Sequence, residues 1–132
     1  MTTMTRERPV RAVVIDDTTD IRDLLRIALS ASGMDVVGEA GDGQEGVDLV
    51  RDSRPDVVIL DLAMPVMDGI EALPLIRDLV PDAQIIVLSA FGGAVSKQVL
   101  ASGADGYLLK GTPLREIVAF VDARLDTGTM EA

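Results

Sequence analysis

Histidine, cysteine and tryptophan are absent from this chain of 132 residues, and aromatic residues make up only 2% of it. The lack of histidine removes the side chain that most often acts as a general base or binds a transition metal. The lack of cysteine excludes disulfides and zinc–thiolate sites, and the few aromatics offer no platform on which bases could stack. The chemistry left to the chain is that of carboxylates and lysine, with hard cations that bind oxygen.

Acidic residues outnumber basic ones by 22 to 12, which gives a formal net charge of −10. Such a surface repels DNA and anionic lipid, so we expect that this chain binds no nucleic acid directly and no membrane. The sequence has neither a signal-peptide pattern nor an apolar run of membrane-spanning length, and we therefore expect a cytoplasmic protein.

The length of the chain suits one domain. We expect a disordered leader over residues 1–9, one domain over residues 10–126 and a loose polar tail over residues 127–132. Five segments between turn-forming residues predict strands, and all of them except Met34–Glu39 contain the continuous apolar runs that are typical of strands buried on both faces of a sheet. They are Val13–Ile15, Met34–Glu39, Val57–Leu60, Ala83–Ser89 and Tyr107–Leu109.

Segments with a helical spacing of apolar residues alternate with these runs. They cover about residues 18–33, 46–53, 69–80, 95–101 and 113–125. We expect Thr18 or Thr19 to cap the first helix and Thr112 to cap the last one, with Pro113 at its first position. Pro74 lies inside the third segment, so this helix is expected either to begin late or to kink.

Alternating strands and helices predict an α/β fold, a flavodoxin-like three-layer sandwich with helices on both faces of a five-stranded parallel sheet. Right-handed crossovers give the common strand order 2-1-3-4-5. This order reverses between the first and third strands, and ligands bind beyond the carboxyl ends of strands at such a point. The topology therefore places Asp16 and Asp17, after the first strand, beside Asp61 at the end of the third.

Four strand ends carry side chains that can handle a phosphoryl group: Asp16–Asp17, Asp61, Ser89 and Lys110. Three carboxylates in one place repel one another, and a divalent cation is the simplest way to keep them ionised. Oxygen ligands with few protein groups suit Mg²⁺. An acid in such a site can attack a phosphoryl group, while Lys110 and Ser89 stabilise the phosphoryl oxygens.

These residues resemble the receiver domain of two-component response regulators over about residues 10–125. The pattern consists of the Asp16–Asp17 pair, Asp61 followed by Met64–Pro65 and Asp68–Gly69, Ser89–Ala90, and Tyr107 three residues before Lys110. The segment 103–110 is most similar to receivers that are attached to LuxR-type helix-turn-helix domains.

The resemblance implies a signalling switch in which Asp61 accepts a phosphoryl group from a sensor histidine kinase or a phosphotransfer protein. It implies Mg²⁺ held by Asp16, Asp17, Asp61 and the backbone carbonyl of Ala63, with Lys110 and Ser89 as further catalytic groups. Ser89 and Tyr107 would form the switch pair. Such a protein catalyses only its own phosphorylation and dephosphorylation, and its output passes through the fourth helix, fifth strand and fifth helix to a partner or an output domain.

Several alternatives stay open at this point. A degenerate receiver would act only as a protein-binding scaffold. A small aspartyl phosphatase of the haloacid dehalogenase kind would need a second acid where Ala63 stands, and a flavin module would need a hydroxyl- and glycine-rich loop in place of Asp17–Asp20. The sequence ends soon after the last predicted helix, which favours either a free-standing receiver or a truncated regulator. The oligomeric state is open, with a homodimer among the alternatives.

Overall fold

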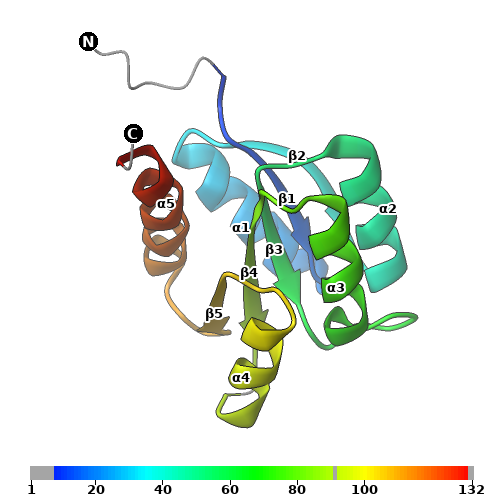
Figure 1. Cartoon of the computed structure of the whole chain (residues 1–132). Helices are drawn as coiled ribbons and strands as arrows, with labels where there is room; N and C mark the ends of the chain where they lie inside the picture. The colour runs from blue at the N-terminus through cyan, green and yellow to red at the C-terminus, as the bar shows by residue number, and fades with distance from the viewer. Residues whose placement is uncertain (1–7, 91, 131–132) are drawn as a thin grey trace.

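The computed structural model describes residues 8–90 and 92–130, with side chains up to residue 125. Within this part of the chain, five strands form one parallel sheet in the order β2-β1-β3-β4-β5, as predicted (Figure 1). The strands are β1 (Arg11–Ile15), β2 (Asp35–Ala40), β3 (Val57–Asp61), β4 (Gln84–Ser89) and β5 (Gly106–Leu109).

The strands alternate with helices that cover both faces of the sheet. The helices are α1 (Thr19–Ala31), α2 (Gly43–Ser53), α3 (Gly69–Leu79), α4 (Ala94–Ala101) and α5 (Leu114–Met130). Figure 1 shows α5 on one side of the sheet and α2 and α3 on the other. One core holds buried residues of α2, α3 and α4, and a second core holds those of α1 and α5. The result is the three-layer α/β sandwich.

Both cores are built from the same central strands, because consecutive strand residues point to opposite faces of a sheet. In β1, Val13 and Ile15 belong to the core under α2–α4, whereas Ala12 and Val14 belong to the core under α1 and α5. All four side chains are fully buried. Continuous apolar runs of this kind are therefore strands buried on both faces, as the sequence indicated.

Helix α3 begins at Gly69, the start that the sequence predicted, and continues through Pro74, so of the two alternatives the late start is wrong and a kink stays a prediction. A capping box fixes this start. Asp68 Oδ1 accepts a hydrogen bond from the backbone N–H of Glu71 at 2.9 Å, and the backbone N–H of Asp68 donates to Glu71 Oε1 at 3.3 Å. These reciprocal bonds satisfy the N–H groups of Asp68 and Glu71, and Pro74 lies on the exposed side of the helix.

Two predicted helix caps are wrong. Thr18 occupies the N-cap position of α1, but its hydroxyl makes no capping hydrogen bond to any described residue. The hydroxyl of Thr112 donates backwards to the carbonyl of Leu109 at 2.6 Å, and the first N–H groups of α5 bond to the carbonyl of Pro113 instead. In both loops, therefore, the threonine hydroxyl does not accept the capping hydrogen bond that the sequence predicted.

The two ends of the domain also differ from the expectation. Arg8 Nη1 lies 2.8 Å from Asp56 Oδ2. Arg8, which the sequence placed in the disordered leader, therefore forms an ion pair with the domain. Helix α5 continues to Met130, and residues 127–130 are therefore helical rather than a loose tail. The rest of the predicted leader and tail, residues 1–7 and 131–132, lies outside the described residues.

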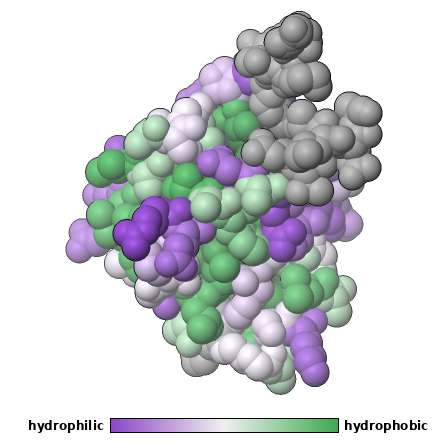
Figure 2. All heavy atoms as spheres, turned by 90° about the vertical axis from the view of Figure 1, so that its left-hand side faces the viewer, coloured by the Kyte–Doolittle hydropathy of each residue, from purple (hydrophilic) through white to green (hydrophobic). Residues whose placement is uncertain are grey.

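The surface on the side of α5 mixes hydrophilic and apolar side chains, with apolar surface running through the middle of the view (Figure 2). Two large apolar side chains of α1, Leu24 and Ile27, are 51% and 58% exposed. Among the described helices, none combines the length and apolar character needed to cross a membrane.

Candidate phosphoacceptor and metal site

The candidate site lies at the carboxyl end of the sheet, where the strand register brings four strand ends together. Ile15 pairs with Leu60, so Asp16 and Asp61, which follow them, reach the same level on neighbouring strands. Ser89 ends β4 and pairs with Leu109, directly before Lys110. The structure thus brings all the strand-end residues selected from the sequence to one edge of the sheet.

The three acids form a compact cluster of carboxylates. Each of Asp16, Asp17 and Asp61 offers one carboxylate oxygen, and these oxygens lie within 4.8 Å of one another. Asp16 and Asp61 are both only 2% exposed, whereas Asp17 is exposed. This donor set of carboxylate oxygens, open to solvent on the Asp17 side, fits a hard divalent cation such as Mg²⁺.

The ammonium group of Lys110 lies against two carboxylates of this cluster. Its Nζ lies 3.0 Å from Asp61 Oδ1 and 3.1 Å from Asp16 Oδ2. Burial alone would lower the pKa of Lys110, but its hydrogen bonds and charge attraction to both carboxylates outweigh burial and raise the pKa above its usual value. Lys110 is therefore a charged cross-link between the ends of β1 and β3. No cis peptide occurs among the described residues, so the Lys110–Gly111 bond is trans.

Asp61 combines burial with an oxygen that is available to a ligand. Burial raises the pKa of Asp61 above its usual value, with a further contribution from the charge of Asp16, against the lowering effect of Lys110. Its Oδ1 is held by Lys110 and by the backbone N–H of Ala63 at 3.4 Å. Its Oδ2 is buried and has no hydrogen-bond partner in the described part of the chain. A buried oxygen in this condition points to a cation or a phosphoryl group as its partner.

Asp16 is held more firmly than the other two acids. Its Oδ1 accepts from the backbone N–H of Thr18 at 2.8 Å, its Oδ2 faces Lys110, and its own N–H donates to the carbonyl of Ala40 at 3.0 Å. Asp17 lies at the surface and retains more freedom. The role of Asp17 as the more direct metal ligand stays a prediction. The carbonyl of Ala63 remains a predicted ligand, since only its N–H is seen to contact Asp61.

Ser89 and Tyr107 lie on the same face of the sheet. Tyr107 pairs with Val87, two residues before Ser89, and its ring packs against the core under α2–α4. Ser89 is 1% exposed, and the phenol oxygen of Tyr107 is buried without a hydrogen-bond partner among the described residues. A switch role for this pair stays a prediction, and the strand register places both residues on the face of the sheet that α2–α4 cover.

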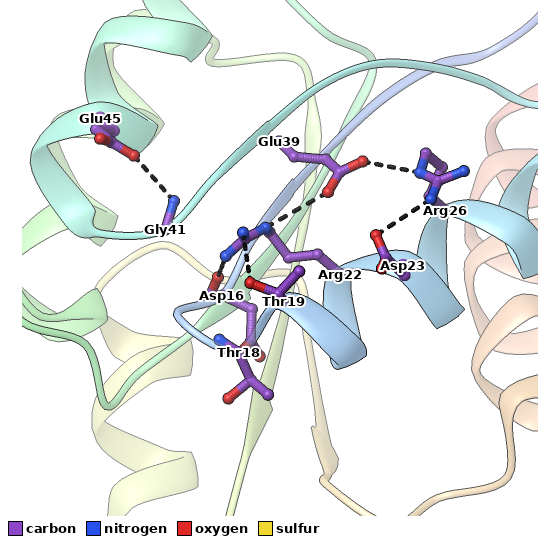
Figure 3. Close-up of polar contacts among 9 residues, drawn as sticks. All are labelled: Asp16, Thr18, Thr19, Arg22, Asp23, Arg26, Glu39, Gly41 and Glu45. Carbon is purple, nitrogen blue, oxygen red and sulfur yellow. Dashed lines mark hydrogen bonds and ion pairs between the residues drawn. The ribbon is translucent and has the colours of Figure 1, made fainter.

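Arg22 belongs to the site and was missed in the sequence. Figure 3 shows its guanidinium between the end of β1, the first turn of α1 and Glu39 of β2, where Nη1 donates to the carbonyl of Asp16 at 2.6 Å. One signal was present. A positive charge in the first turn of a helix opposes the helix dipole, so an arginine at this position calls for a partner outside the helix.

Comparisons with known proteins agree with this geometry. The sequence pattern of the response regulator receiver domain matches residues 12–122. The response regulator MprA of Mycolicibacterium vanbaalenii is 43% identical over 119 residues, which cover 89% of this chain and 51% of that protein. This chain therefore spans about half the length of that curated relative.

Solved structures give the same result. The receiver domain of the putative response regulator NarL from Mycobacterium tuberculosis superposes with a TM-score of 0.80 at 37% identity, and covers 91% of this chain and 96% of that one. A two-component response regulator of the LuxR family from Aurantimonas sp. SI85-9A1 has a TM-score of 0.83 at 32% identity, with coverages of 90% and 86%. On fold, pattern and sequence identity, the chain belongs to the response regulator receiver domain family.

Proposed function

We propose that this chain is a phosphorylation switch in which Asp61 takes a phosphoryl group from a phosphohistidine on a sensor histidine kinase or a phosphotransfer protein. The observation that carries the proposal is the buried Asp61 Oδ2. It has no hydrogen-bond partner among the described residues, although it lies in a cluster that also contains Asp16, Asp17 and the ammonium of Lys110.

In the proposed step, a carboxylate oxygen of Asp61 forms a bond to phosphorus while the phosphorus–nitrogen bond of the donor breaks. The electron pair of that bond leaves with the imidazole nitrogen. Mg²⁺, held by Asp16, Asp17, Asp61 and the carbonyl of Ala63, would neutralise the carboxylates and the phosphoryl oxygens. Lys110 can turn from Asp61 Oδ1 towards a phosphoryl oxygen, and the hydroxyl of Ser89 can donate a hydrogen bond to another.

The donor is proposed to dock beside Lys110, on the side of α1. A groove of about 190 Å³ lies between α1 and the start of α5. Its walls include Ile21, Leu24, Lys110 and Leu114. The exposed Leu24 and Ile27 extend the apolar surface along α1. A partner helix on this surface would be close enough to Asp61 to present its phosphohistidine.

The output face is proposed to be α4, β5 and α5. Helix α4 is short and follows Gly93, an N-cap residue with a φ of 67° and no side-chain cap, and it buries only Val99 among its residues. Segments with so few buried contacts open at low free energy. A change at Ser89 and Tyr107 can therefore shift α4 and reach a partner protein or an output domain.

The test is phosphorylation of the whole chain by a small acyl phosphate with Mg²⁺, followed by mass measurement of the intact protein. We expect one added phosphoryl group on the wild type and on Asp48→Asn, a control at an exposed acid of α2, and none on Asp61→Asn. Equal labelling of Asp61→Asn would overturn the assignment. A wild type that takes up no phosphoryl group would favour the scaffold alternative.

A further inference from the structure

We infer that Arg22 is a positioning residue of the phosphorylation site: it orients the Asp16–Asp17 peptide and so sets the affinity of the cluster for a divalent cation, without touching the cation itself. The inference rests on the proposed function of the cluster. It assigns a role to a side chain on α1 that the sequence analysis did not include among the candidate site residues.

The guanidinium of Arg22 joins three elements that meet at the site (Figure 3). Its Nη1 donates to the carbonyl of Asp16 at 2.6 Å, its Nη2 to Thr19 Oγ1 at 3.2 Å, and its Nε lies 3.4 Å from Glu39 Oε1. The Arg22 side chain is 18% exposed, and its bond to the Asp16 carbonyl is partly buried, whereas its bond to Thr19 is exposed. A planar fork with donors on three nitrogens can hold such divergent acceptors together, and a lysine ammonium cannot.

The bond to the Asp16 carbonyl matters because a peptide unit is rigid. The carbonyl of Asp16 and the Cα atoms of Asp16 and Asp17 lie in one plane. A donor that fixes the direction of this carbonyl therefore fixes the orientation at which Asp17 leaves β1. Asp17 is the exposed acid of the cluster, and among the hydrogen bonds within the described residues its carboxylate has only a long contact with Thr18 Oγ1, at 3.5 Å.

The surroundings of Arg22 are built to receive the guanidinium. A Cβ atom on Gly41 would lie 3.3 Å from Arg22 Nη1, so glycine leaves the space that the guanidinium fills. Glu39 offsets the positive charge that Arg22 brings to the first turn of α1, where the helix dipole disfavours a cation. Glu39 also binds Arg26 Nε at 2.9 Å. Arg26 thus shares the acid with Arg22 but, unlike Arg22, is not seen to contact the Asp16 carbonyl.

Substitutions of Arg22 and Arg26 can distinguish an effect of loop positioning on cation affinity from an effect of charge alone. Arg22→Gln removes one positive charge near the cluster, which by electrostatics alone would tighten the binding of a cation. If Arg22 instead positions the loop, the same substitution weakens binding. Arg22→Lys keeps the charge but loses the fork, so charge alone predicts no change and positioning predicts weaker binding. Arg26→Gln removes an equal charge and a shorter contact with Glu39, 2.9 Å against 3.4 Å for Arg22, together with an ion pair to Asp23, and serves as the control.

The experiment titrates Mg²⁺ into the whole chain by calorimetry and follows hydrogen exchange of the Thr18 amide by NMR, with thermal unfolding recorded in parallel. We expect Mg²⁺ to bind about tenfold more weakly to Arg22→Gln and Arg22→Lys, the scale seen when groups that orient metal ligands are removed. Arg26→Gln should stay within about twofold of the wild type. The Thr18 amide, which donates to Asp16 Oδ1, should exchange faster in both Arg22 variants.

Unchanged or tighter Mg²⁺ binding by Arg22→Gln would overturn the inference, as would equal weakening in Arg26→Gln. If the wild type binds no Mg²⁺, the proposed function fails. The exchange of the Thr18 amide then decides whether Arg22 orders the loop, and equal exchange in wild type and variants would end the inference as well.

Discussion

Lys110 and Asp61 form an ion pair between a partly exposed lysine and a buried acid, with 3.0 Å between Nζ and Oδ1, and the lysine also holds Asp16. Asp17 adds a third carboxylate within 4.8 Å. The carboxylate charge therefore exceeds the charge of the ammonium. Two of the three carboxylates are buried, so this excess of negative charge lowers stability, and a bound cation should offset that loss.

Replacing Lys110 by methionine should lower the free energy of unfolding without Mg²⁺ by about 2 kcal/mol, because two buried carboxylates lose their charged partner. Excess Mg²⁺ should restore part of the loss, since the cation takes over the role of the ammonium. Lys97→Met, at an exposed position of α4, is the control and should change stability by less than about 0.5 kcal/mol. Urea unfolding with and without Mg²⁺ measures both. A Lys110→Met protein as stable as the wild type would contradict the prediction.

Asp61→Asn should stabilise the metal-free protein at neutral pH, and the gain should shrink as the pH falls. Burial raises the pKa of Asp61 in the folded state, so this carboxyl favours folding when protonated and disfavours it when ionised. Its contribution to stability is present below the unfolded pKa and is lost as the pH rises through the folded pKa.

Thermal unfolding of wild type and Asp61→Asn across the acidic range measures this dependence. Asp48→Asn is the opposite case. A hydrogen bond from Arg51 lowers the pKa of Asp48. Replacing the Asp48 carboxylate by an amide should therefore bring no stabilisation at neutral pH. A gain for Asp61→Asn that grows on acidification would show that the sign is wrong.

Tyr107→Phe should stabilise the protein by about 1 kcal/mol. The phenol oxygen is buried without a hydrogen-bond partner in the described structure, and an unsatisfied buried polar group costs about 1–3 kcal/mol. The ring keeps its packing against the core, whereas Tyr107→Leu, the companion variant, loses it and should destabilise. Chemical unfolding of both variants checks the pair. A loss of stability in Tyr107→Phe would mean that the hydroxyl has a partner in solution.

The fold could be predicted because its strongest determinant is local. Val13–Ile15 and Val57–Leu60 are apolar without interruption, and only strands covered on both faces satisfy such runs. The acid cluster followed from the same strands, because parallel strands end at a common edge. Placing Asp16 and Asp61 side by side needed one more step, the common strand order 2-1-3-4-5, which makes the first and third strands neighbours.

The details that the sequence analysis missed depend on alternative local conformations of similar energy. The hydroxyl of Thr112 can cap a helix or bond backwards to Leu109, and the sequence does not rank the two. The reach of Arg22 to the carbonyl of Asp16 depends on the rotamers of a long side chain. Val66 adopts a left-handed conformation, with φ of 68°, while 83% exposed. A β-branched residue is rarely found there, so nothing in the sequence pattern indicates it.

Asp17→Asn should abolish most of the response to Mg²⁺ while leaving the fold intact. Asp17 is exposed, so the substitution removes a repelling charge without opening a cavity, and the metal-free protein should gain less than about 1 kcal/mol. Its carboxylate is the least constrained oxygen donor of the cluster, and we expect Mg²⁺ to bind at least about tenfold more weakly without it.

Asp20→Asn provides the matched control for this loss. It removes the same charge three residues further along, from the first turn of α1, where the side chain is exposed and is not part of the carboxylate cluster. Calorimetric titration with Mg²⁺ should therefore distinguish ligation from a general effect of charge: Asp20→Asn binds within about twofold of the wild type if Asp17 is a ligand. Equal weakening of both variants would show that net charge, rather than the position of Asp17 in the cluster, sets the affinity.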